Sequence, residues 1–476
     1  MTFLLGIDIG TTTITSIAVE AESGTIVESA TTANDARYTD RPAGRSEWDG
    51  NRIMDQALKC VSDVVAQLGS RATNIAGIGM TGQQHGMVLI DRNLTPISPY
   101  INWQDQRGNE LDANGLPLID SLNNRLGENQ YEQHGCLLRT GFMNVTLHWL
   151  NQNGLLPVNC RAAFIMDLFA SRLCNAPLIS DPTTAASAGL LNIHNNQWDQ
   201  DAISELGIPL NILPEVQTVR ERVGTITGEI AHTTGLPKGI PVFVAIGDNQ
   251  ASFLGSVADR HTQLSINVGT GGQVSAYSNQ IGHHESLEVR PFPYGGFLLA
   301  NVGACGGRSF AALENFFQAV ARDIFEIEPD DSAYQRMKQL AAQTVAAPTG
   351  LKCSPIFTGT RQDPSQRASW TGLTPDNFTP ALLTRSLLEG MATTFNEGFA
   401  AILSCGVTGI SEIVGAGNGI RENSVLQECI ESQFNMQVRK PLQNEEATLG
   451  AAITAAIGCG LLNDLSDSSR WIQYEE

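Results

Sequence analysis

Two apolar runs open the chain, Phe3–Ile9 and Ile14–Glu20, and the turn Gly10-Thr11-Thr12-Thr13 separates them. Short apolar runs around a polar turn are typical of a β-hairpin. The pattern returns later, where Leu264–Val268 is followed by Gly269-Thr270-Gly271-Gly272 and then by Gln273–Tyr277. The two halves of the chain are therefore predicted to begin in the same way, as an internal repeat on the scale of a domain.

Helical periodicity follows these strand-like runs in each half. In the second half, apolar residues recur at helical spacing over Ala381–Leu403 and Asn423–Phe434. A Gly- and Pro-rich stretch, GLPKGIP, precedes the apolar strand Val242–Ile246, and such punctuation marks a boundary. Alternating strands and helices predict an α/β fold. We expect two domains, residues 1–246 and residues 247–476.

Length and charge narrow the function classes. A chain of 476 residues exceeds the roughly 250–300 residues that one hydrophobic core supports, which agrees with two domains. Lys and Arg number 29 against 49 Asp and Glu, and the net charge is −20. This excess of negative charge disfavours nucleic acid and anionic membranes as partners. Only five of the cations are lysines, so a phosphorylated ligand would need backbone N–H groups, a metal ion or arginines.

Cysteine usage and the apolar segments suggest a compartment. The nine cysteines are scattered without a C-x-x-C pair, which predicts reduced thiols that act as small buried hydrophobic residues. The N-terminal MTFLLGIDIG lacks the basic region of a signal peptide. The apolar stretch 450–462 is too short for a membrane span and predicts a buried helix. We therefore expect a cytoplasmic protein, with the acidic end Asp464–Glu476 as a surface tail.

One familiar nucleotide-binding pattern is rejected on its context. Gly77-Ile-Gly79-Met-Thr-Gly82 matches G-x-G-x-x-G, but that motif needs a helix at its end to hold a pyrophosphate. The segment that follows, QQHGMVLID, is strand-like. A Walker A motif is also excluded, because no lysine of the chain precedes Ser or Thr.

The first hairpin carries candidate phosphate chemistry. A Gly-Thr turn exposes backbone N–H groups and hydroxyls that can hold phosphate oxygens without lysine. Asp8, just before the turn, is the kind of carboxylate that holds Mg²⁺ beside substrate phosphates. The alternative is an ordinary hairpin with an exposed Asp. The second copy, which begins Asn267-Val-Gly269-Thr270, favours two facing hairpins that clamp a polyphosphate across a cleft.

Further candidates follow predicted strands. Asp248 ends the strand at the domain boundary, where α/β proteins place their sites, and it could be a general base. The alternative is an N-cap for a helix that begins at Gln250. The loop Gly415-Ala-Gly417-Asn418-Gly419 follows the predicted strand Ile410–Val414. It could let a flat ligand such as adenine lie against the backbone, or it could be a plain glycine-rich loop.

Two polar-aromatic segments suit a polyhydroxylated ligand. They are Gln83-Gln84-His85 and Trp103-Gln104-Asp105-Gln106-Arg107, which offer amides, an imidazole, an indole and a carboxylate. For His85, a buried structural histidine is the alternative reading.

The order of these motifs resembles the FGGY carbohydrate kinases of the actin-like ATPase superfamily. The motifs are DIGTTT, TGQQHG, WQDQR, GDNQ, NVGTGG, GAGNG and EEATLGAA, and they extend over nearly the whole chain. Within the family the chain is most similar to sedoheptulokinases and then to xylulokinases. The similarity to sedoheptulokinases rests on the segments WQDQR, HGCLLRTGFMNVTLHWL, SDPTTAASAGLLN and GDNQAS. Gln84 departs from both groups, which usually carry Met there.

The resemblance implies a fold and an activity. The fold is two ribonuclease-H-like α/β domains around a cleft, with the sugar mainly on the first domain and ATP mainly on the second. The activity is ATP-dependent phosphorylation of the terminal hydroxyl of a ketose, with sedoheptulose first. Xylulose or another sugar or polyol remains an alternative substrate, and a sugar-sensing protein without catalysis remains an alternative class. A homodimer is a further expectation.

The resemblance also implies residue roles. Asp248 corresponds to the catalytic base and Asp8 to the acid that organises Mg²⁺ and ATP. The implied sugar-binding residues are Gln84, His85, Trp103, Asp105 and Asn249. The implied ATP-binding residues are Gly10, Thr11, Thr12, Thr13, Gly269, Thr270, Gly271, Gly307, Gly415, Gly417 and Asn418.

Overall fold

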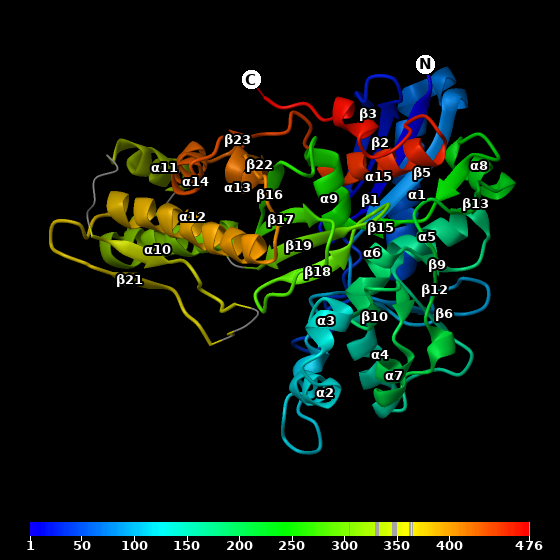
Figure 1. The fold of residues 1–476 in the computed structure, drawn as a ribbon, viewed down its shortest axis with the longest axis horizontal. Helices are drawn as coiled ribbons and strands as arrows, with labels where there is room; N and C mark the ends of the chain where they lie inside the picture. The colour runs from blue at the N-terminus through cyan, green and yellow to red at the C-terminus, as the bar shows by residue number, and fades with distance from the viewer. Residues whose placement is uncertain (304, 329–332, 345–349, 361–362, 364, 476) are drawn as a thin grey trace.

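A computed structural model describes residues 1–303, 305–328, 333–344, 350–360, 363 and 365–475. Two mixed β-sheets form its frame, each covered by helices (Figure 1). The first sheet has the order β13-β14-β5-β1-β2-β3, and β15 also pairs with β5. Its strands are β1 (Phe3–Ile9), β2 (Thr13–Glu20), β3 (Ile26–Ala33), β5 (Ile75–Gly82), β13 (Arg222–Thr225), β14 (Pro241–Phe243) and β15 (Ile246–Gly247).

The second sheet repeats the plan of the first. Its order is β18-β19-β17-β16-β22-β23. Its strands are β16 (Gln263–Val268), β17 (Gly272–Ser278), β18 (Glu288–Pro291), β19 (Phe297–Val302), β22 (Glu412–Ala416) and β23 (Val438–Arg439). In both sheets an antiparallel hairpin pairs on one side with a parallel strand that follows a long crossover. The predicted α/β fold, both hairpins and the internal repeat are confirmed.

Helices flank both sheets, and short strand pairs lie outside them. The helices are α1 (Gly50–Leu68), α2 (Leu118–Leu126), α3 (Gln130–His134), α4 (Met143–Gln152), α5 (Ile165–Cys174), α6 (Pro182–Ala185), α7 (Gln200–Glu205), α8 (Gly228–Thr234), α9 (Asp248–Ser256), α10 (Gly307–Phe325), α11 (Ala333–Gln343), α12 (Pro380–Ser404), α13 (Asn418–Arg421), α14 (Ser424–Phe434) and α15 (Glu446–Gly458). The short strands are β4 (Glu47–Trp48), β6 (Val88–Ile90), β7 (Tyr100–Ile101), β8 (Arg161–Ala163), β9 (Ile179–Ser180), β10 (Leu191–Asn192), β11 (Gln197–Trp198), β12 (Glu215–Val216), β20 (Lys352–Ser354) and β21 (Ser369–Thr371). Helices α12 and α14 confirm the periodic segments predicted at 381–403 and 423–434.

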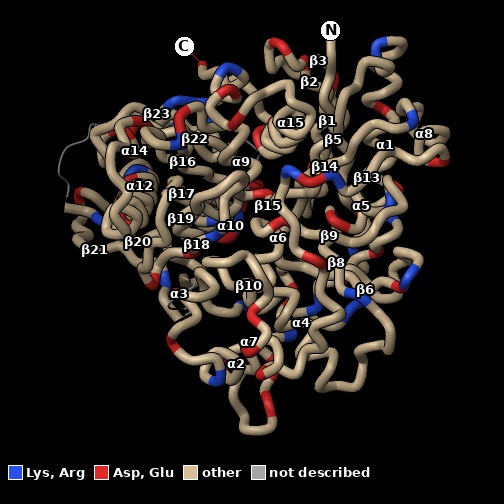
Figure 2. The backbone as a smooth tube through the Cα atoms, turned by 45° about the vertical axis from the view of Figure 1, so that its right-hand side comes forward, with Lys and Arg blue, Asp and Glu red and all other residues tan. Residues whose placement is uncertain are grey.

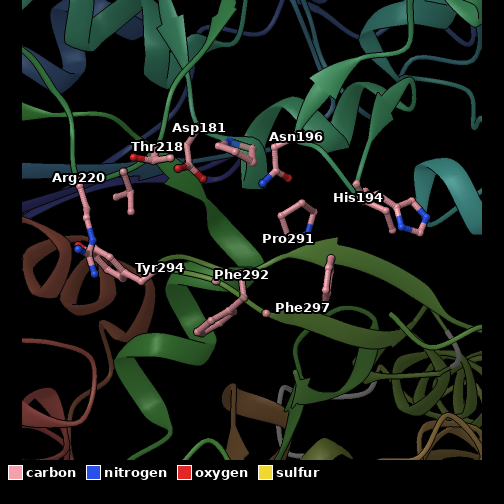
Figure 3. Close-up of a pocket in the computed structure, with 14 residues that line it drawn as sticks. Asp181, His194, Asn196, Thr218, Arg220, Pro291, Phe292, Tyr294 and Phe297 are labelled. Carbon is pink, nitrogen blue, oxygen red and sulfur yellow. The ribbon is translucent and has the colours of Figure 1, made fainter. Parts of the chain in front are cut away.

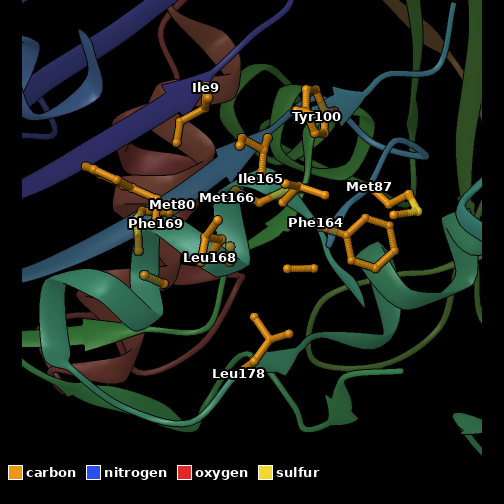
Figure 4. Close-up of a cluster of buried hydrophobic side chains, with 14 of the residues drawn as sticks. Ile9, Met80, Met87, Tyr100, Phe164, Ile165, Met166, Leu168, Phe169 and Leu178 are labelled. Carbon is orange, nitrogen blue, oxygen red and sulfur yellow. The ribbon is translucent and has the colours of Figure 1, made fainter. Parts of the chain in front are cut away.

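The core of the first half lies between its sheet and α5. Ile9 and Met80 of adjacent strands face Met166 and Phe169 of this helix, and all four are buried (Figure 4). Each fully buried side chain of this size contributes roughly 1.5–3 kcal/mol. The carboxyl ends of β1 and β5 are therefore rigidly supported where the candidate residues begin.

Helix α15 packs against the first sheet and α9 through backbone rather than through long side chains. A Cβ atom on Gly6 of β1 would overlap the carbonyl oxygen of Thr448, and one on Gly79 of β5 would overlap that of Ala451. Gly450 approaches α9 equally closely. In Figure 1, α15 lies beside α9 and crosses β1. The glycines of the rejected nucleotide pattern thus lie in the extended strand β5, where at least Gly79 serves close packing.

Four local predictions differ from the structure. The run 242–246 is interrupted, because β14 and β15 pair with β5 in registers that differ by one residue. Helix α9 begins at Asp248 and not at Gln250, and its N-cap is Gly247. Strand β22 begins two residues later than predicted. The acidic end is not a surface tail, because Trp471 is buried against Gly24. Its last residue lies outside the described part.

Other expectations agree with the described residues. The nine cysteines are all free, as predicted. Helix α15, which contains most of the apolar stretch 450–462, is buried. Among the described residues, no helix has the length and apolarity to cross a membrane. Acidic and basic residues are scattered over both halves (Figure 2).

We predict that Gly450→Ala destabilises the protein. In a solvent-exposed helix this change would stabilise by about 1 kcal/mol, because alanine has the higher helix propensity. Here the new methyl group meets the backbone of α9, and we expect a net loss of about 1–3 kcal/mol. Gly228→Ala at the start of α8 is the matched control, because its Cβ would meet only the flexible side chain of Lys238, at 4.0 Å. Chemical denaturation measures both, and equal stabilities would contradict the close contact.

Candidate active site

Three parallel strands bring two carboxylates to one edge of the first sheet. Asp8 of β1 is paired with Thr81 of β5, and Thr81 is paired with Ile246 of β15. Asp248 follows β15 directly as the first residue of α9. The carboxyl ends of parallel strands lie at the same sheet edge. Asp8 and Asp248 consequently line one small cavity of about 270 Å³, although 240 residues of sequence separate them.

Asp248 is half-buried at the N-terminus of α9. The backbone N–H of Asn249 donates to Asp248 Oδ1 over 2.8 Å. Burial raises the pKa of this carboxyl from 3.8 to about 6, although backbone hydrogen bonds oppose the shift. Its position inside the helix rejects the alternative that Asp248 is an N-cap. The carboxylate has a pKa near the working range of a general base.

Asp8 has an unsatisfied oxygen in the small cavity. Its Oδ1 is buried without a hydrogen-bond partner among the described residues. Burial, together with the charges of Asp248 and Glu445, raises the pKa of Asp8 from 3.8 to about 7. A cation would relieve both the unpaired oxygen and this repulsion. The full lining is Asp8, Asp248, Asn249, Ser252, Asn267, Asn444, Glu445, Glu446, Ala447 and Thr448.

A larger cavity of about 500 Å³, here called the cleft, adjoins the same residues. It is lined by both halves of the chain, and Asp248, Asn249 and Asn267 belong to both cavities. The lining is Gln84, His85, Trp103, Asp248, Asn249, Asn267, Gly269, Thr270, Gly271, Gly272, Gln273, Val302, Gly303, Cys305, Gly306, Arg308, Ser309, Phe357 and Thr358. The structure therefore brings together Asp248, four predicted sugar-site residues (Gln84, His85, Trp103 and Asn249) and the second Gly-Thr turn.

His85 is presented to the cleft in a constrained conformation. Its backbone is left-handed, with φ 75°, and its ring stacks on Phe142 at 4.4 Å between centroids. Nδ1 lies 2.9 Å from the carbonyl oxygen of Ser187, which can only accept, so Nδ1 carries the hydrogen. In the neutral ring, Nε2 is then the acceptor nitrogen. His85 is half-buried and lines the cleft, while its Nδ1 is satisfied by Ser187, so both interpretations, a sugar-site histidine and a structural one, stay predictions.

Gln84 and Trp103 connect the cleft to its surroundings. Gln84 Nε2 donates to the carbonyl oxygen of Thr183 over 3.0 Å and lies 3.3 Å from Gln250 Oε1. Trp103 is 44% exposed, which is unusual for an indole and leaves its face available to a ligand. Its Nε1 donates to Thr11 Oγ1 of the first Gly-Thr turn over 3.0 Å. The first turn therefore lies beside the cleft.

The second Gly-Thr turn is joined to the start of α10. The N–H of Gly307 donates to the carbonyl oxygen of Gly269 over 2.9 Å, and that of Arg308 donates to Thr270 over 3.0 Å. A Cβ atom on Gly306 would overlap Gly271. Glycine is thus required where this turn and the helix start meet. The arrangement offers backbone N–H groups at the cleft wall, and among the described lining residues Arg308 alone brings a guanidinium.

Some predicted site residues lie away from both cavities. Asp105 is completely buried, where it pairs with Arg107 and accepts from the N–H of Ser46 over 2.8 Å. Gly417 has the left-handed φ of 79° and abuts Asn267. The residues that line neither cavity are Gly10, Thr11, Thr12, Thr13, Asp105, Gly307, Gly415, Gly417 and Asn418.

The structure adds residues that sequence reasoning did not single out. Asn267 precedes the second Gly-Thr turn by the same spacing as Asp8 precedes the first, so the internal repeat was a usable signal. Glu445 lies at the start of α15 and repels Asp8. Ser252 is one turn of α9 beyond Asp248. Arg308 and Phe357 carry no local motif and are brought to the cleft by tertiary structure alone.

Comparisons with known proteins agree with this arrangement. Residues 3–255 match the N-terminal domain of the FGGY family of carbohydrate kinases, and residues 264–459 match its C-terminal domain. Sedoheptulokinase of Mus musculus is 29% identical over 94% of this chain and 96% of its own length. Xylulose kinase of Staphylococcus xylosus is 26% identical over 100% of this chain and 95% of its own.

Solved structures share the fold. Xylulose kinase from Rhodospirillum rubrum superposes with a TM-score of 0.87 at 22% identity, over 100% of this chain and 93% of its own. Gluconate kinase from Lactobacillus acidophilus gives 0.87 at 21% identity with the same coverage. The two domain matches together span nearly the whole chain. The chain therefore belongs to the FGGY family of carbohydrate kinases, and it is a sugar kinase with the actin-like ATPase fold.

Proposed function

We propose that the enzyme transfers the γ-phosphoryl group of ATP to the terminal hydroxyl of a ketose, with sedoheptulose as the substrate. The observation that carries the reaction is the position of Asp248, which is shared by the cleft and the small acidic cavity. A base at that junction can contact a sugar hydroxyl on one side and face the phosphate site on the other.

Asp248 is the base of the proposed reaction. Its carboxylate takes the proton of the ketose hydroxyl as the oxygen attacks the γ-phosphorus in line and the bond to the ADP oxygen breaks. Phosphoryl transfer depends mainly on positioning and charge neutralisation. The α9 N-terminus and the N–H of Asn249 hold the carboxylate in place. Asn249, which lines both cavities, is positioned to contact the sugar.

The phosphates of ATP are assigned to the two Gly-Thr turns, 10–13 and 269–271. Their backbone N–H groups and hydroxyls supply hydrogen bonds without lysine, as a chain with a net charge of −20 requires. The loop Gly415 to Asn418 is proposed for the adenosine, because Gly417 abuts Asn267 at the cleft. Gly307 supports the second turn by its hydrogen bond to Gly269.

Mg²⁺ fits the acidic cavity. Asp8 would hold it, because the unpaired Oδ1 is a carboxylate oxygen of the type Mg²⁺ prefers. When bound beside the phosphates, the ion neutralises charge that develops during transfer. Among the described residues, no three His, Cys, Asp or Glu side chains form a common metal cage. The protein would thus supply a carboxylate and leave further coordination to water and phosphate.

The sugar is assigned to the first-half wall of the cleft. His85 Nε2 can accept from one hydroxyl, and the Trp103 face can stack on the carbon skeleton. Sedoheptulose is preferred because sedoheptulokinase is among the closely similar relatives at 29% identity. Xylulose is the second candidate, since xylulose kinase follows at 26%. Asp105 is proposed to act indirectly, by ordering the segment that carries Trp103.

The proposal also covers the cellular compartment and the oligomeric state of the enzyme. We infer a cytoplasmic enzyme, because nine free cysteines suit a reducing compartment. A homodimer remains our expectation from the family. The division into a sugar-binding domain, residues 1–246, and an ATP-binding domain, residues 247–476, also stays a prediction. Strand β15, which spans this boundary, belongs to the first sheet.

We expect Asp248→Asn to lower kcat by about 10²–10⁴-fold while ATP and sugar still bind, because an amide cannot take the proton. Steady-state kinetics and calorimetry measure the two effects. Asp55→Asn, an exposed carboxylate on α1, is the matched control and should retain normal turnover. Near-normal kcat in Asp248→Asn would remove Asp248 as the base.

The pH profile offers an independent test of the same residue. A base must be ionised, and the raised pKa of Asp248 moves its titration to about 6. Below that pH, kcat/KM should fall roughly tenfold per unit at saturating Mg²⁺, which keeps Asp8 ionised. The acid limb should vanish from the residual activity of Asp248→Asn. A limb that persists unchanged in that variant would assign the titration to another group.

A substrate panel tests the choice of sugar. ADP release should be measured with sedoheptulose, xylulose and polyols, and compared as kcat/KM. We expect sedoheptulose to give the highest value. A preference for xylulose would replace the substrate and keep the reaction, whereas binding without ADP release would indicate a sugar-sensing protein.

A further inference from the structure

A second cavity, here called the back cavity, lies at the seam between the two halves. Its volume is about 340 Å³. The first half contributes Asp181, Asn196 and Arg220, and the second half contributes the turn between β18 and β19 (Figure 3). The lining is Asp181, Pro182, Ile193, His194, Asn196, Thr218, Val219, Arg220, Pro291, Phe292, Tyr294, Gly295, Gly296 and Phe297.

A hydrogen-bonded layer separates the back cavity from the cleft. Gln84, on the cleft side, bonds to Thr183, which follows the back-cavity residues Asp181 and Pro182. Gln250 Nε2 donates to the carbonyl oxygen of Pro291 over 3.1 Å, on the opposite wall. The two cavities share no lining residue. The back cavity is therefore a separate compartment and not an extension of the sugar site.

The upper wall in Figure 3 is rich in hydrogen-bond acceptors. Asn196 Oδ1 is buried without a hydrogen-bond partner among the described residues, and the side chain points toward Pro291. An unpaired buried acceptor is unfavourable, and a donor from a ligand would satisfy it. Asp181, 3% exposed, accepts from the N–H of Thr183 over 2.8 Å and keeps further acceptor capacity. Both groups call for hydroxyl donors.

A cation lies at the mouth of the same cavity. The Arg220 guanidinium is placed over the ring of Tyr294 at 5.2 Å from its centroid. Among the described residues, the guanidinium of Arg220 forms no ion pair and no hydrogen bond. Arg220 is exposed, so its guanidinium remains accessible to an anion. On the opposite wall, Phe297 supplies an apolar side chain against which a carbon skeleton can pack, whereas the ring of Phe292 points away from the cavity and packs on Phe253 and Tyr277.

We propose that the back cavity binds a small hydroxylated anion, a sugar phosphate or a sugar acid, distinct from the substrate in the cleft. Its hydroxyls donate to Asn196 and Asp181, and its anionic group pairs with Arg220. Because the two walls belong to different halves of the chain, the ligand contacts both and its affinity depends on their relative position. Binding is thereby linked to the relative position of the two halves, which also line the cleft.

Isothermal titration of the full-length enzyme tests the site with three probes: ribose 5-phosphate, gluconate and ribitol. We expect at least one charged probe to bind, and ribitol, which lacks the anion, to bind at least tenfold more weakly. Preference for ribose 5-phosphate or for gluconate identifies phosphate or carboxylate as the anionic group. Equal binding of ribitol, or no binding of either charged probe, overturns the proposal.

Variants locate the bound probe. Arg220→Gln should weaken binding roughly 10–100-fold, the usual effect of losing a hydrogen bond to a charged group. Arg220→Lys should keep part of the affinity for the probe, because lysine preserves the positive charge. Asn196→Gly should also weaken binding, and it keeps the left-handed φ of 56° without strain. Trp103→Ala, in the cleft, is the matched control and should bind the probe normally. Binding lost in Trp103→Ala but kept in Arg220→Gln would place the probe in the cleft.

The linkage has its own readout. The dissociation constant of the probe should change at least about threefold when ADP and Mg²⁺ are bound, and the probe should alter ADP affinity by the same factor. Identical constants with and without ADP would overturn the linkage.

Discussion

The contact of α15 with the first sheet and with α9 is the constraint on which the geometry of the site depends. Gly6, Gly79 and Gly450 let backbone meet backbone, so neither rotamers nor side-chain length can adjust the spacing. Helix α9 begins with Asp248, and α15 begins beside Glu445. The distance between two helices thus fixes the distance between carboxylates. Asp248 and Glu445, which lie far apart in sequence, therefore have fixed relative positions, because the helices that carry them are in close backbone contact.

A shortage of positive charge determines the electrostatics of the cleft and of the acidic cavity. The cleft wall has Arg308, and the acidic cavity has no cation among its described lining residues. Burial raises the pKa values of Asp8 and Asp248, and the charges of Asp248 and Glu445 contribute to the rise at Asp8. In the proposed function, an anionic cosubstrate is held by oriented backbone donors and a metal ion, which suits two hairpin turns made of glycine and threonine. In the proposed mechanism, the raised pKa of Asp248 suits this carboxylate to take a proton.

Local features of this chain were readable from sequence, and tertiary ones were not. The hairpins at Gly10 and Gly269 follow from apolar runs around a turn, and their repetition predicted the paired sheets. Trp471 could not be placed, because its burial depends on Gly24, almost the whole chain away. Asp105 follows an exposed tryptophan in sequence, but its buried pairing with Arg107 is a property of the fold. Nothing local marks Arg308 as a cleft residue.

Gln84 illustrates how the fold can explain a departure in sequence. The resemblance to sedoheptulokinases and xylulokinases implied Met at this position. In the structure its amide nitrogen bonds to Thr183 and faces Gln250, both buried in the layer between the cleft and the back cavity. A methionine would leave the Thr183 carbonyl and Gln250 Oε1 without this donor, and each loss costs about 1–3 kcal/mol. Gln84 therefore completes the hydrogen bonds of the layer between the two cavities. Its presence alone does not argue against a ketose in the cleft.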